Sequence, residues 1–413
     1  MPGPHCLIYE PDVTGHRLQH VHHLADALLA IGCRVTLALQ ADCREHAEYR
    51  VHAKALEPHV DVYARLDPHH SLRFMARRRR VAELIDTMAA LEPDWCYVPY
   101  ADATTQLGTL ESILWGNGPF RRVPIEAQIM RGKYGYPRQS RLDAISSAAN
   151  RYLTRRNPWH VMHILDPFAL NGLKPLPREH RFRLIPEPVE PLPAIDQLTA
   201  RATLGIPGDG RYLAFVGGLY PHKGIEHLVA GFARAELVES DRLLFVGKMA
   251  PPIRELFNSA YDALLRQGRI IVIDRYVSDH ELGSAFVAAD VIAVAHPRQV
   301  GSSGTLVRGA AAKRLLLSSD FGWIGWATAA FRLGVTVNVT DLDRYAAAIN
   351  TALEQSGDYR LGTAAERFCA YHTVANQQAH WIDEICRVHS LARGPIPECI
   401  PWSWVMEAVD AVK

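Results

Sequence analysis

Five short runs of apolar residues between residues 212 and 319 constrain the fold more than any other feature of this sequence. They span 212–217, 242–247, 269–274, 290–295 and 315–319. None alternates between apolar and polar residues, as expected for strands that are covered on both faces. Helical patterns lie between and after them; the residues of 341–355 that share one apolar stripe are Leu342, Tyr345, Ala346, Ile349 and Leu353. This alternation of strand and helix predicts a parallel, doubly wound sheet.

The first half of the chain repeats the plan more loosely. A strand at 5–9 leads to a loop with Gly15, a helix through Ile31 and a strand at 34–39. Further strands are expected at 95–99, 124–129, 161–165 and 183–185. We therefore predict an α/β protein with two Rossmann-like, doubly wound domains that face each other across a cleft, where such domains bind ligands.

The boundary between the two domains is expected in a proline-rich stretch. Residues 186–193 contain four prolines, which disfavour a helix and favour an extended linker. The predicted domains are 1–190 and 191–375. Residues 376–413 would form a C-terminal helix and tail that could pack back on the first domain.

Composition narrows the choice of partners and compartment. The net charge of +1 gives no global basic field that would indicate a nucleic-acid partner. The seven cysteines are odd in number, scattered and never spaced C-x-x-C, which argues for a reducing compartment. No apolar run approaches the roughly 18 residues of a membrane span, and no signal-peptide core opens the chain. We expect a cytoplasmic protein.

A run of four arginines, Arg77–Arg80, lies within an expected helix that reaches Ala90. Beside Leu72, Phe74 and Met75, this basic face could contact anionic lipid at the inner face of a membrane or a lipid-linked molecule. A solvated helix face is the other interpretation.

The stretch 215–224 is the first candidate for chemistry. An expected strand ends at Gly217, and Lys223 stands directly before the next helix. Amide donors and an ammonium group that converge at a helix start suit a diphosphate. A plain strand-to-helix turn with a solvated lysine is equally compatible with this spacing.

At this stretch the sequence resembles a known family. Phe-Val-Gly-x-Leu-x-Pro-x-Lys-Gly at 215–224, followed by the helical pattern at 225–233, resembles the C-terminal domain of retaining glycosyltransferases of family 4, the group 1 glycosyl transferases. The stretch 275–291 looks like the loop, helix and strand of that domain, and 185–207 is similar to its interdomain passage. The resemblance covers 183–390 well and the first half only by its pattern.

The resemblance implies the GT-B fold and transfer of a hexosyl group from a UDP- or GDP-linked sugar, with retention and without a metal or other cofactor. By position, Gly218 and Lys223 would lie at the diphosphate, and the backbone of Tyr276 and Val277 would meet the base. The Gly15 loop would approach the phosphates from the first domain. Residues 1–190 would bind the acceptor and residues 191–375 the donor. The acceptor, whether glycan, lipid-linked or small molecule, is not identified.

Three departures from the family pattern bear on activity. The usual arginine after the strand glycine is Gly218, and the two usual carboxylates fall at about Val300 and Arg308. The Gly-x-Pro turn of the family becomes Lys313-Arg314-Leu315. Three alternatives follow: an enzyme that holds its donor differently, an inactive protein that binds a nucleotide or sugar, and an epimerase or hydrolase of the same fold.

The segment 298–314 contains no acidic residue and is predicted to feed a helix begun by Gly301–Gly304. The amides of such a helix start bind phosphate. Arg308, one turn later, could replace the missing cation, or it could be a solvated helix residue. The candidate donor-binding residues of this segment are Ser302, Ser303, Gly304, Thr305 and Arg308.

Four histidines lie between residues 14 and 23. His16, His20 and His23 share one helical face at a spacing that can bind zinc. No acidic ligand lies within the motif, and the family it resembles is metal-independent, so we expect no metal. His16 directly follows Gly15 and is a candidate for proton transfer.

The expected strand at 124–129 runs through Met130 into Arg131-Gly-Lys133, where the family often has a histidine. Arg131 and Lys133 would bind an anionic acceptor or a donor phosphate. A solvated loop is the other interpretation. The predicted catalytic residues are thus His16, Arg131 and Lys223.

Overall fold

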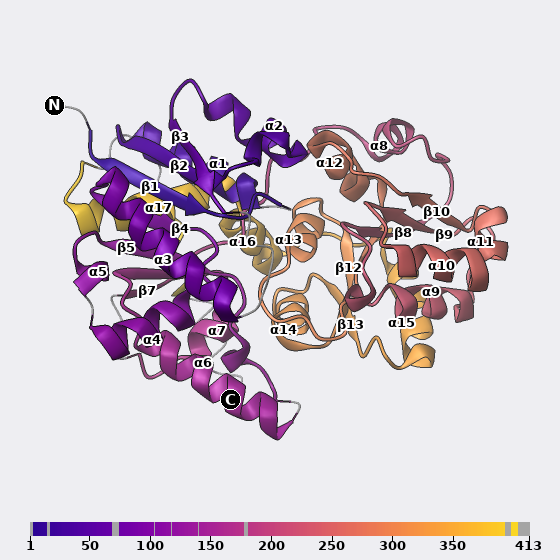
Figure 1. Ribbon diagram of the computed structural model, residues 1–413. Coiled ribbons are helices and arrows are strands. Elements are labelled where there is room, and N and C mark those ends of the chain that lie inside the picture. Colours follow the sequence, from indigo (N-terminus) through magenta and orange to yellow (C-terminus); the bar gives the residue numbers. More distant parts are fainter. Residues whose placement is uncertain are drawn as a thin grey trace. The chain divides into compact units, whose positions relative to one another are not determined.

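The computed structural model spans the whole chain and divides it into two compact units. The first comprises Met1–Pro186 and Val374–Lys413, and the second Glu187–Thr373. The division lies inside the proline-rich stretch. The residues described are 3–14, 17–67, 74–102, 104–116, 118–138, 140–176, 181–392 and 398–403. Each unit is built on one parallel sheet with helices on both faces (Figure 1).

The sheet of the first unit has seven strands in the order β3-β2-β1-β4-β5-β6-β7, and every neighbouring pair is parallel. The strand order reverses between β1 and β4, which is the switch point of a doubly wound sheet. The strands are β1 His5–Glu10, β2 Arg34–Gln40, β3 Asp61–Leu66, β4 Trp95–Val98, β5 Ile125–Ile129, β6 Val161–Ile164 and β7 Phe182–Leu184.

Two layers of helices bury the faces of this sheet. Leu24 of α1 and Trp381 of α17 belong to the core on one face, and Leu84 of α3 and Leu107 of α4 to the core on the other. The helices are α1 Arg17–Ala30, α2 Ala47–His52, α3 Phe74–Leu91, α4 Thr105–Trp115, α5 Gly118–Arg121, α6 Arg141–Arg155, α7 Pro167–Gly172 and α17 Val374–His389. Short 3-10 turns are η1 Cys43–Glu45, η2 Lys54–Leu56 and η3 Lys133–Gly135.

The second unit has six parallel strands in the order β10-β9-β8-β11-β12-β13, with the switch point between β8 and β11. The strands are β8 Tyr212–Val216, β9 Arg242–Val246, β10 Ile270–Ile273, β11 Val291–Val294, β12 Leu315–Ser319 and β13 Gly334–Val337. The helices are α8 Gln197–Thr203, α9 Ile225–Arg234, α10 Pro251–Ala260, α11 Asp262–Arg266, α12 Asp279–Ala288, α13 Gly304–Ala311, α14 Gly322–Ala330, α15 Leu342–Gln355 and α16 Thr363–Tyr371, with the 3-10 turn η5 Pro221–Lys223.

The structure confirms the α/β class and each of the expected strands, with ends that differ by at most one residue. Two strands were not predicted, β3 and β13. Both lie at an edge of their sheet. Edge strands are covered less completely, and their side chains here are largely part-buried, so neither carries the continuous apolar run by which the central strands were found.

The arginine run lies in the first turns of α3. Arg78 is within 3.7 Å of Glu111 and stacks on the ring of Trp115 at 5.7 Å, both on α4. Arg79 is exposed. Leu72 lies outside the described residues. None of the described helices has the length and apolar character needed to cross a membrane.

Candidate functional site

The turn that carries Lys223 begins at the carboxyl end of β8, a central strand of the second unit. Gly224 adopts the left-handed conformation with φ of 74°, and a Cβ there would lie 2.1 Å from the carbonyl oxygen of Ala295. Only glycine fits this position. At Gly217, a Cβ would lie 3.8 Å from Nζ of Lys223. The Lys223 ammonium is therefore held over the glycine turn at the end of β8.

Gly218 occupies the position where the family pattern has an arginine. A Cβ at Gly218 would lie 2.6 Å from the ring of Tyr220. The Tyr220 ring thus occupies the space that the Cβ of an arginine at position 218 would need. The same ring lies 5.9 Å from Nζ of Lys223, so Tyr220 borders both residues.

The helix start expected at 301–304 is present, but it begins later than predicted. α13 starts at Gly304, and the hydroxyl of Ser303 caps it by accepting the N–H of Leu306 at 3.3 Å. Ser302 therefore lies in the preceding loop and not in the helix. The Thr305 hydroxyl donates to the carbonyl of Val216 at 3.3 Å, which fixes the start of α13 beside the end of β8.

A carboxylate that the sequence did not reveal lies at this helix start. Glu187 accepts a hydrogen bond from the hydroxyl of Ser302. A Cβ on Gly304 would lie 2.7 Å from Nη1 of Arg308 and 3.7 Å from Oε1 of Glu187, so both charged groups lie against the first turn of α13. Burial raises the pKa of Glu187, and the Ser302 hydrogen bond and the Arg308 charge oppose that shift.

His296 follows β11 and is buried close to the lysine turn. Its ring centroid lies 6.2 Å from that of Phe215 on β8. Burial lowers the pKa of His296 to about 3, and the positive charge of Lys223 contributes to the same shift. The ring is therefore neutral at physiological pH and adds no charge to the site.

Tyr276 and Val277 follow β10, which lies two strands from β8 at the edge of the sheet. Tyr276 is exposed, and its carbonyl accepts a hydrogen bond from Arg275 at 3.4 Å. The carboxyl ends of parallel strands lie on the same side of the sheet, so Tyr276 and Val277 lie on the same side as Lys223.

The predicted residues of the first unit are only partly described. Gly15 and His16 lie outside the described residues. Arg131 is exposed, and its backbone N–H donates to Asp102 at 2.9 Å. The N–H of Met130 donates to the same carboxylate at 3.0 Å, so Asp102 fixes the backbone that presents Arg131. Lys133 is exposed in η3.

A charged cluster at the carboxyl end of β1 was also missed. Glu10 is buried and accepts a hydrogen bond from Arg17 at 3.0 Å. Asp12 lies 3.3 Å from the same guanidinium, which stacks on the ring of Tyr100 at 4.5 Å. Burial raises the pKa of Glu10 to about 7, although Arg17 counteracts the shift. The strand pattern gave no sign that its last residue carries a buried carboxyl.

Two of the three histidines predicted to share one face of α1, His20 and His23, lie within the described residues. His20 and His23 are buried, and the ring of His20 lies edge-on to Tyr100 at 5.8 Å. Within the described ranges, no group of three or more His, Cys, Asp and Glu side chains is placed to hold a metal ion.

The structure brings together most of the donor-site residues predicted in the second unit. Its elements place Lys223 and Gly218 after β8, and the start of α13 carries Ser302 to Thr305 with Arg308. Arg308 and Glu187 therefore lie against the first turn of α13, and Lys223 lies at the end of β8, to which that turn is hydrogen-bonded through Thr305. Cations near a helix N-terminus suit an anion. Of the charged residues at this helix start, Glu187 is the one that could not be predicted from the sequence, because it comes from the linker and reaches α13 only in the folded protein.

Comparisons with known proteins agree on the architecture. No protein-family model and no curated protein sequence matches this chain. Among solved structures, HepE of Anabaena, in complex with UDP and glucose, is 15% identical, with 94% of this chain and 100% of that chain covered and a TM-score of 0.65. Sucrose-phosphate synthase of Thermosynechococcus elongatus is 17% identical, with 94% and 99% covered and a TM-score of 0.69.

A third similar structure is WaaG, a glycosyltransferase involved in lipopolysaccharide biosynthesis. It is 14% identical, with 89% of this chain and 95% of that chain covered and a TM-score of 0.58. Likenesses at these identities establish the fold. The chain has the GT-B fold, with one Rossmann-like α/β domain built on each of its two parallel sheets.

Proposed function

We propose that this protein is a glycosyltransferase that moves a hexosyl group from a nucleotide-diphosphate sugar, UDP- or GDP-linked, to an acceptor hydroxyl. Retention and independence of metal are parts of this proposal. The observation that carries it is the meeting of the Lys223 ammonium and the α13 start at the end of β8. The solved complexes of HepE with UDP and with UDP-glucose, on the same fold, support a nucleotide-sugar donor.

The chemistry asks for stabilisation of negative charge on the leaving group. The bond from the sugar C1 to the diphosphate oxygen breaks, and the acceptor oxygen bonds to C1 on the face that the diphosphate leaves. The proton of the acceptor hydroxyl passes to His16, the residue proposed for proton transfer. Charge then develops on the diphosphate. Lys223 and the amides of the α13 start would meet that charge, with Arg308 as a second cation.

Glu187 would replace the carboxylates that the family pattern has at about 300 and 308, and its oxygens would accept hydrogen bonds from the donor. Its carboxylate reaches the α13 start from the linker and already accepts from Ser302. In the proposed complex it accepts a hydrogen bond from a hydroxyl of the donor sugar. His16 in proton transfer, Arg131 as an anion-binding group, and Gly15, Tyr276 and Val277 at the nucleotide complete the proposed set.

A screen of nucleotides with their sugars tests this function. A ligand that binds only the folded state stabilises it by about 2.7 kcal/mol at a hundredfold excess over Kd. We expect one base among UDP, GDP, ADP and CDP to raise the melting temperature selectively, and its hexose derivative to release nucleoside diphosphate. No stabilisation by any of them, together with no release, would contradict the proposal.

The second candidate is a protein that binds a nucleotide sugar without turning it over. The observation in its favour is Arg308, a cation at a position where the family has a carboxylate. The same screen separates the two candidates. Selective stabilisation without release of nucleoside diphosphate from any donor, across a panel of sugar acceptors, would favour the binding protein.

A further inference from the structure

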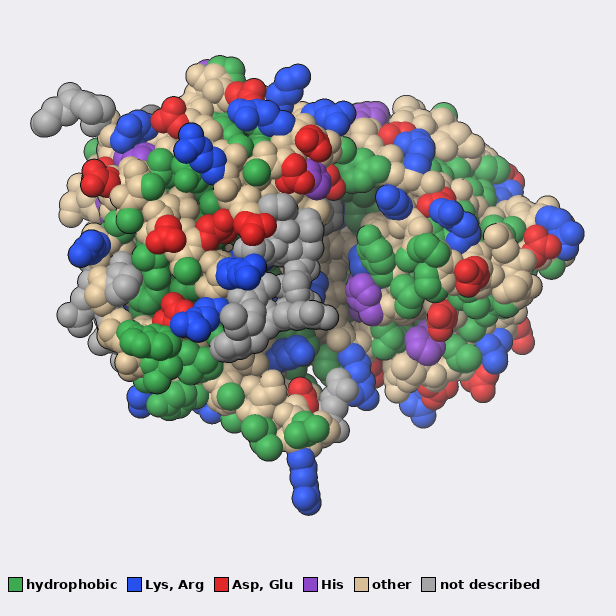
Figure 2. Space-filling model, in the orientation of Figure 1, with side chains coloured by type: hydrophobic (Ala, Val, Ile, Leu, Met, Phe, Trp, Pro, Cys, Tyr) green, Lys and Arg blue, Asp and Glu red, His purple; other side chains and the backbone are tan. Residues whose placement is uncertain are grey.

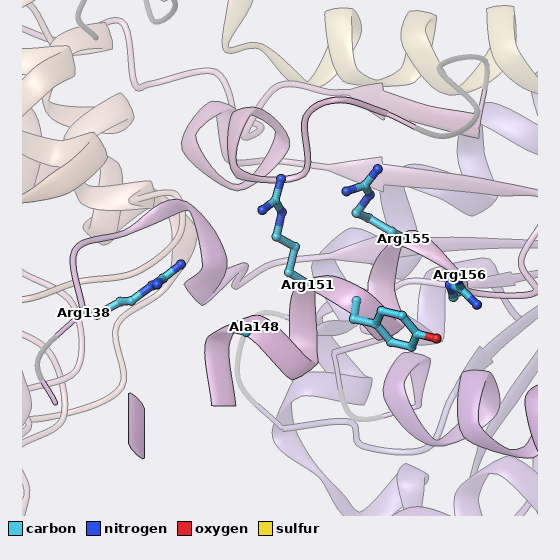
Figure 3. A pocket seen from close by; sticks show the side chains of 6 residues that line it. Arg138, Ala148, Arg151, Arg155 and Arg156 are labelled. Carbon is cyan, nitrogen blue, oxygen red and sulfur yellow. The ribbon is translucent and has the colours of Figure 1, made fainter. Parts of the chain in front are cut away.

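The first unit contains an arginine-lined cavity that includes none of the residues given a role in the proposed function. A cavity of about 420 Å³ is lined by Arg138, Ala148, Arg151, Tyr152, Arg155 and Arg156 (Figure 3). Four of these six residues are arginines and none is acidic. Figure 3 shows Arg138 reaching from its loop towards the side of α6 that carries Arg151.

Backbone carbonyls, not carboxylates, hold two of these guanidinium groups. Arg155 donates to the carbonyl of Pro175 at 2.6 Å, and Arg151 donates to the carbonyl of Lys174. Nε of Arg151 is buried and has no hydrogen-bond partner in the described part of the chain. Arg156 stacks on the ring of Tyr152 at 4.5 Å. Within the described ranges no ion pair involves any of the four arginines.

Four like charges around one cavity repel one another unless an anion joins them. One planar guanidinium group can donate to two phosphate oxygens at the same time, which an ammonium group does not do with the same geometry. We propose that this arginine pocket binds a phosphate-bearing ligand, with two or more anionic oxygens shared among Arg138, Arg151, Arg155 and Arg156. This site is additional to the proposed donor site and does not depend on glycosyl transfer.

The helix that carries the pocket exposes apolar side chains beside it. In α6 the most buried residues, Ser147 and Thr154, are small and polar, whereas Leu142 and Ile145 are 79% and 67% exposed. Hydrophobic side chains also gather over the neighbouring α4 (Figure 2), where Leu114 and Trp115 are exposed. The phosphate could therefore come from a lipid headgroup or from a soluble phosphate compound, and the test must separate these sources.

The pocket variant is the double substitution Arg138→Gln with Arg156→Gln, because both side chains are exposed and neither is held by a backbone carbonyl. The matched control is Arg65→Gln with Arg122→Gln. It removes two exposed arginines from the same unit, and Arg65 also stacks on a tyrosine, Tyr63, at 5.5 Å. All proteins carry Lys223→Ala, which weakens diphosphate binding at the proposed donor site.

Two assays are run on each protein: calorimetric titration with inorganic pyrophosphate, and co-sedimentation with vesicles of phosphatidylcholine alone or with phosphatidylglycerol. We expect the pocket variant, but not the control, to lose at least tenfold in affinity in one or both assays. Loss for pyrophosphate alone identifies a soluble phosphate ligand. Loss for phosphatidylglycerol vesicles, with competition by pyrophosphate, identifies a headgroup.

The proposal is overturned if the Lys223→Ala protein binds neither probe, or if the pocket and control variants lose affinity equally in both assays. Unchanged melting temperatures establish that the variants are folded. Release of nucleoside diphosphate is measured in parallel on the same arginine substitutions without Lys223→Ala. A failure of the pocket is thereby distinguished from a failure of the proposed function.

Discussion

The carboxylate of Glu187 accepts a hydrogen bond from the hydroxyl of Ser302, although 115 residues separate the two along the chain. The linker thus delivers an acidic group to the start of α13, a segment whose own residues from 298 to 314 include no acid. The group lies beside Arg308, against the first turn of that helix. A carboxylate therefore lies at this helix start although residues 300 and 308, where the pattern of the resembled family has carboxylates, are Val and Arg.

Glu187→Gln tests whether Glu187 takes the place of the carboxylates in the family pattern. The amide removes a negative charge near the proposed diphosphate, so binding of the nucleoside diphosphate alone is expected to stay unchanged or to tighten. Turnover of the nucleotide sugar is expected to fall at least tenfold, because the amide is a weaker acceptor for a sugar hydroxyl. Calorimetry and a product-release assay measure the two effects.

The control for this experiment is Glu239→Gln, which removes an exposed carboxylate from the same unit. It should alter neither quantity. Equal losses of binding and turnover in Glu187→Gln would instead point to a purely structural role of Glu187 in holding the loop at Ser302.

Glu10 gives a pH dependence whose sign follows from its environment. Its pKa is raised from 4.5 to about 7 in the folded protein, so folding favours the protonated form. The stability associated with that proton is fully present below pH 4.5 and is lost as the pH rises through 7. Between pH 5.5 and 8.5 the loss amounts to about 2 kcal/mol.

Glu10→Gln removes this dependence, because glutamine does not titrate, and Arg17 keeps its contact with Asp12. The free energy of unfolding of the variant relative to wild type should therefore rise by about 2 kcal/mol from pH 5.5 to pH 8.5. Urea denaturation at both values measures it, with Glu45→Gln, an exposed carboxylate, as the control. A difference that stays constant between the two pH values would show that Glu10 is already ionised in the folded protein at pH 5.5.

Gly224 is expected to be indispensable for the turn that positions Lys223. Gly224→Ala meets both a left-handed backbone and the Ala295 carbonyl oxygen at 2.1 Å. Gly205 has a similar φ of 67°, but a Cβ there meets nothing within 4 Å. Gly205→Ala should cost about 1–2 kcal/mol from the backbone alone, and Gly224→Ala clearly more, as measured by urea denaturation. Equal costs would show that the Ala295 segment moves away freely.

Much of the fold could be predicted because each buried parallel strand appears in the sequence as a continuous apolar run. β8, β9 and β11 are continuous apolar runs followed by glycine or by a helical pattern, and the structure contains each of them. The strands β3 and β13 show no such run, because edge strands are part-exposed and tolerate polar residues. The α13 start was predicted three residues early, because Gly301 and Ser302 look like a helix start but Ser303 provides the cap.

The candidate site was predictable only where it is local in sequence. Lys223 and Gly217 belong to one turn, and Thr305 and Arg308 belong to one helix, so the spacing indicated which residues lie together; their proposed roles came from the family resemblance. Glu187 and Glu10 could not be identified in this way. The first reaches its partner across the fold, and the second is notable only because β1 buries its side chain, which is a property of packing and not of pattern.

The most direct test of the central claim is the rate of nucleoside diphosphate release by Lys223→Ala, measured with the donor that the screen selects. Loss of a group that stabilises developing negative charge typically costs about 10²–10³ in kcat. We expect a loss of that size, while Lys54→Ala, which removes an exposed lysine of the first unit, stays within twofold of wild type. A folded Lys223→Ala protein that retains wild-type turnover would contradict the account.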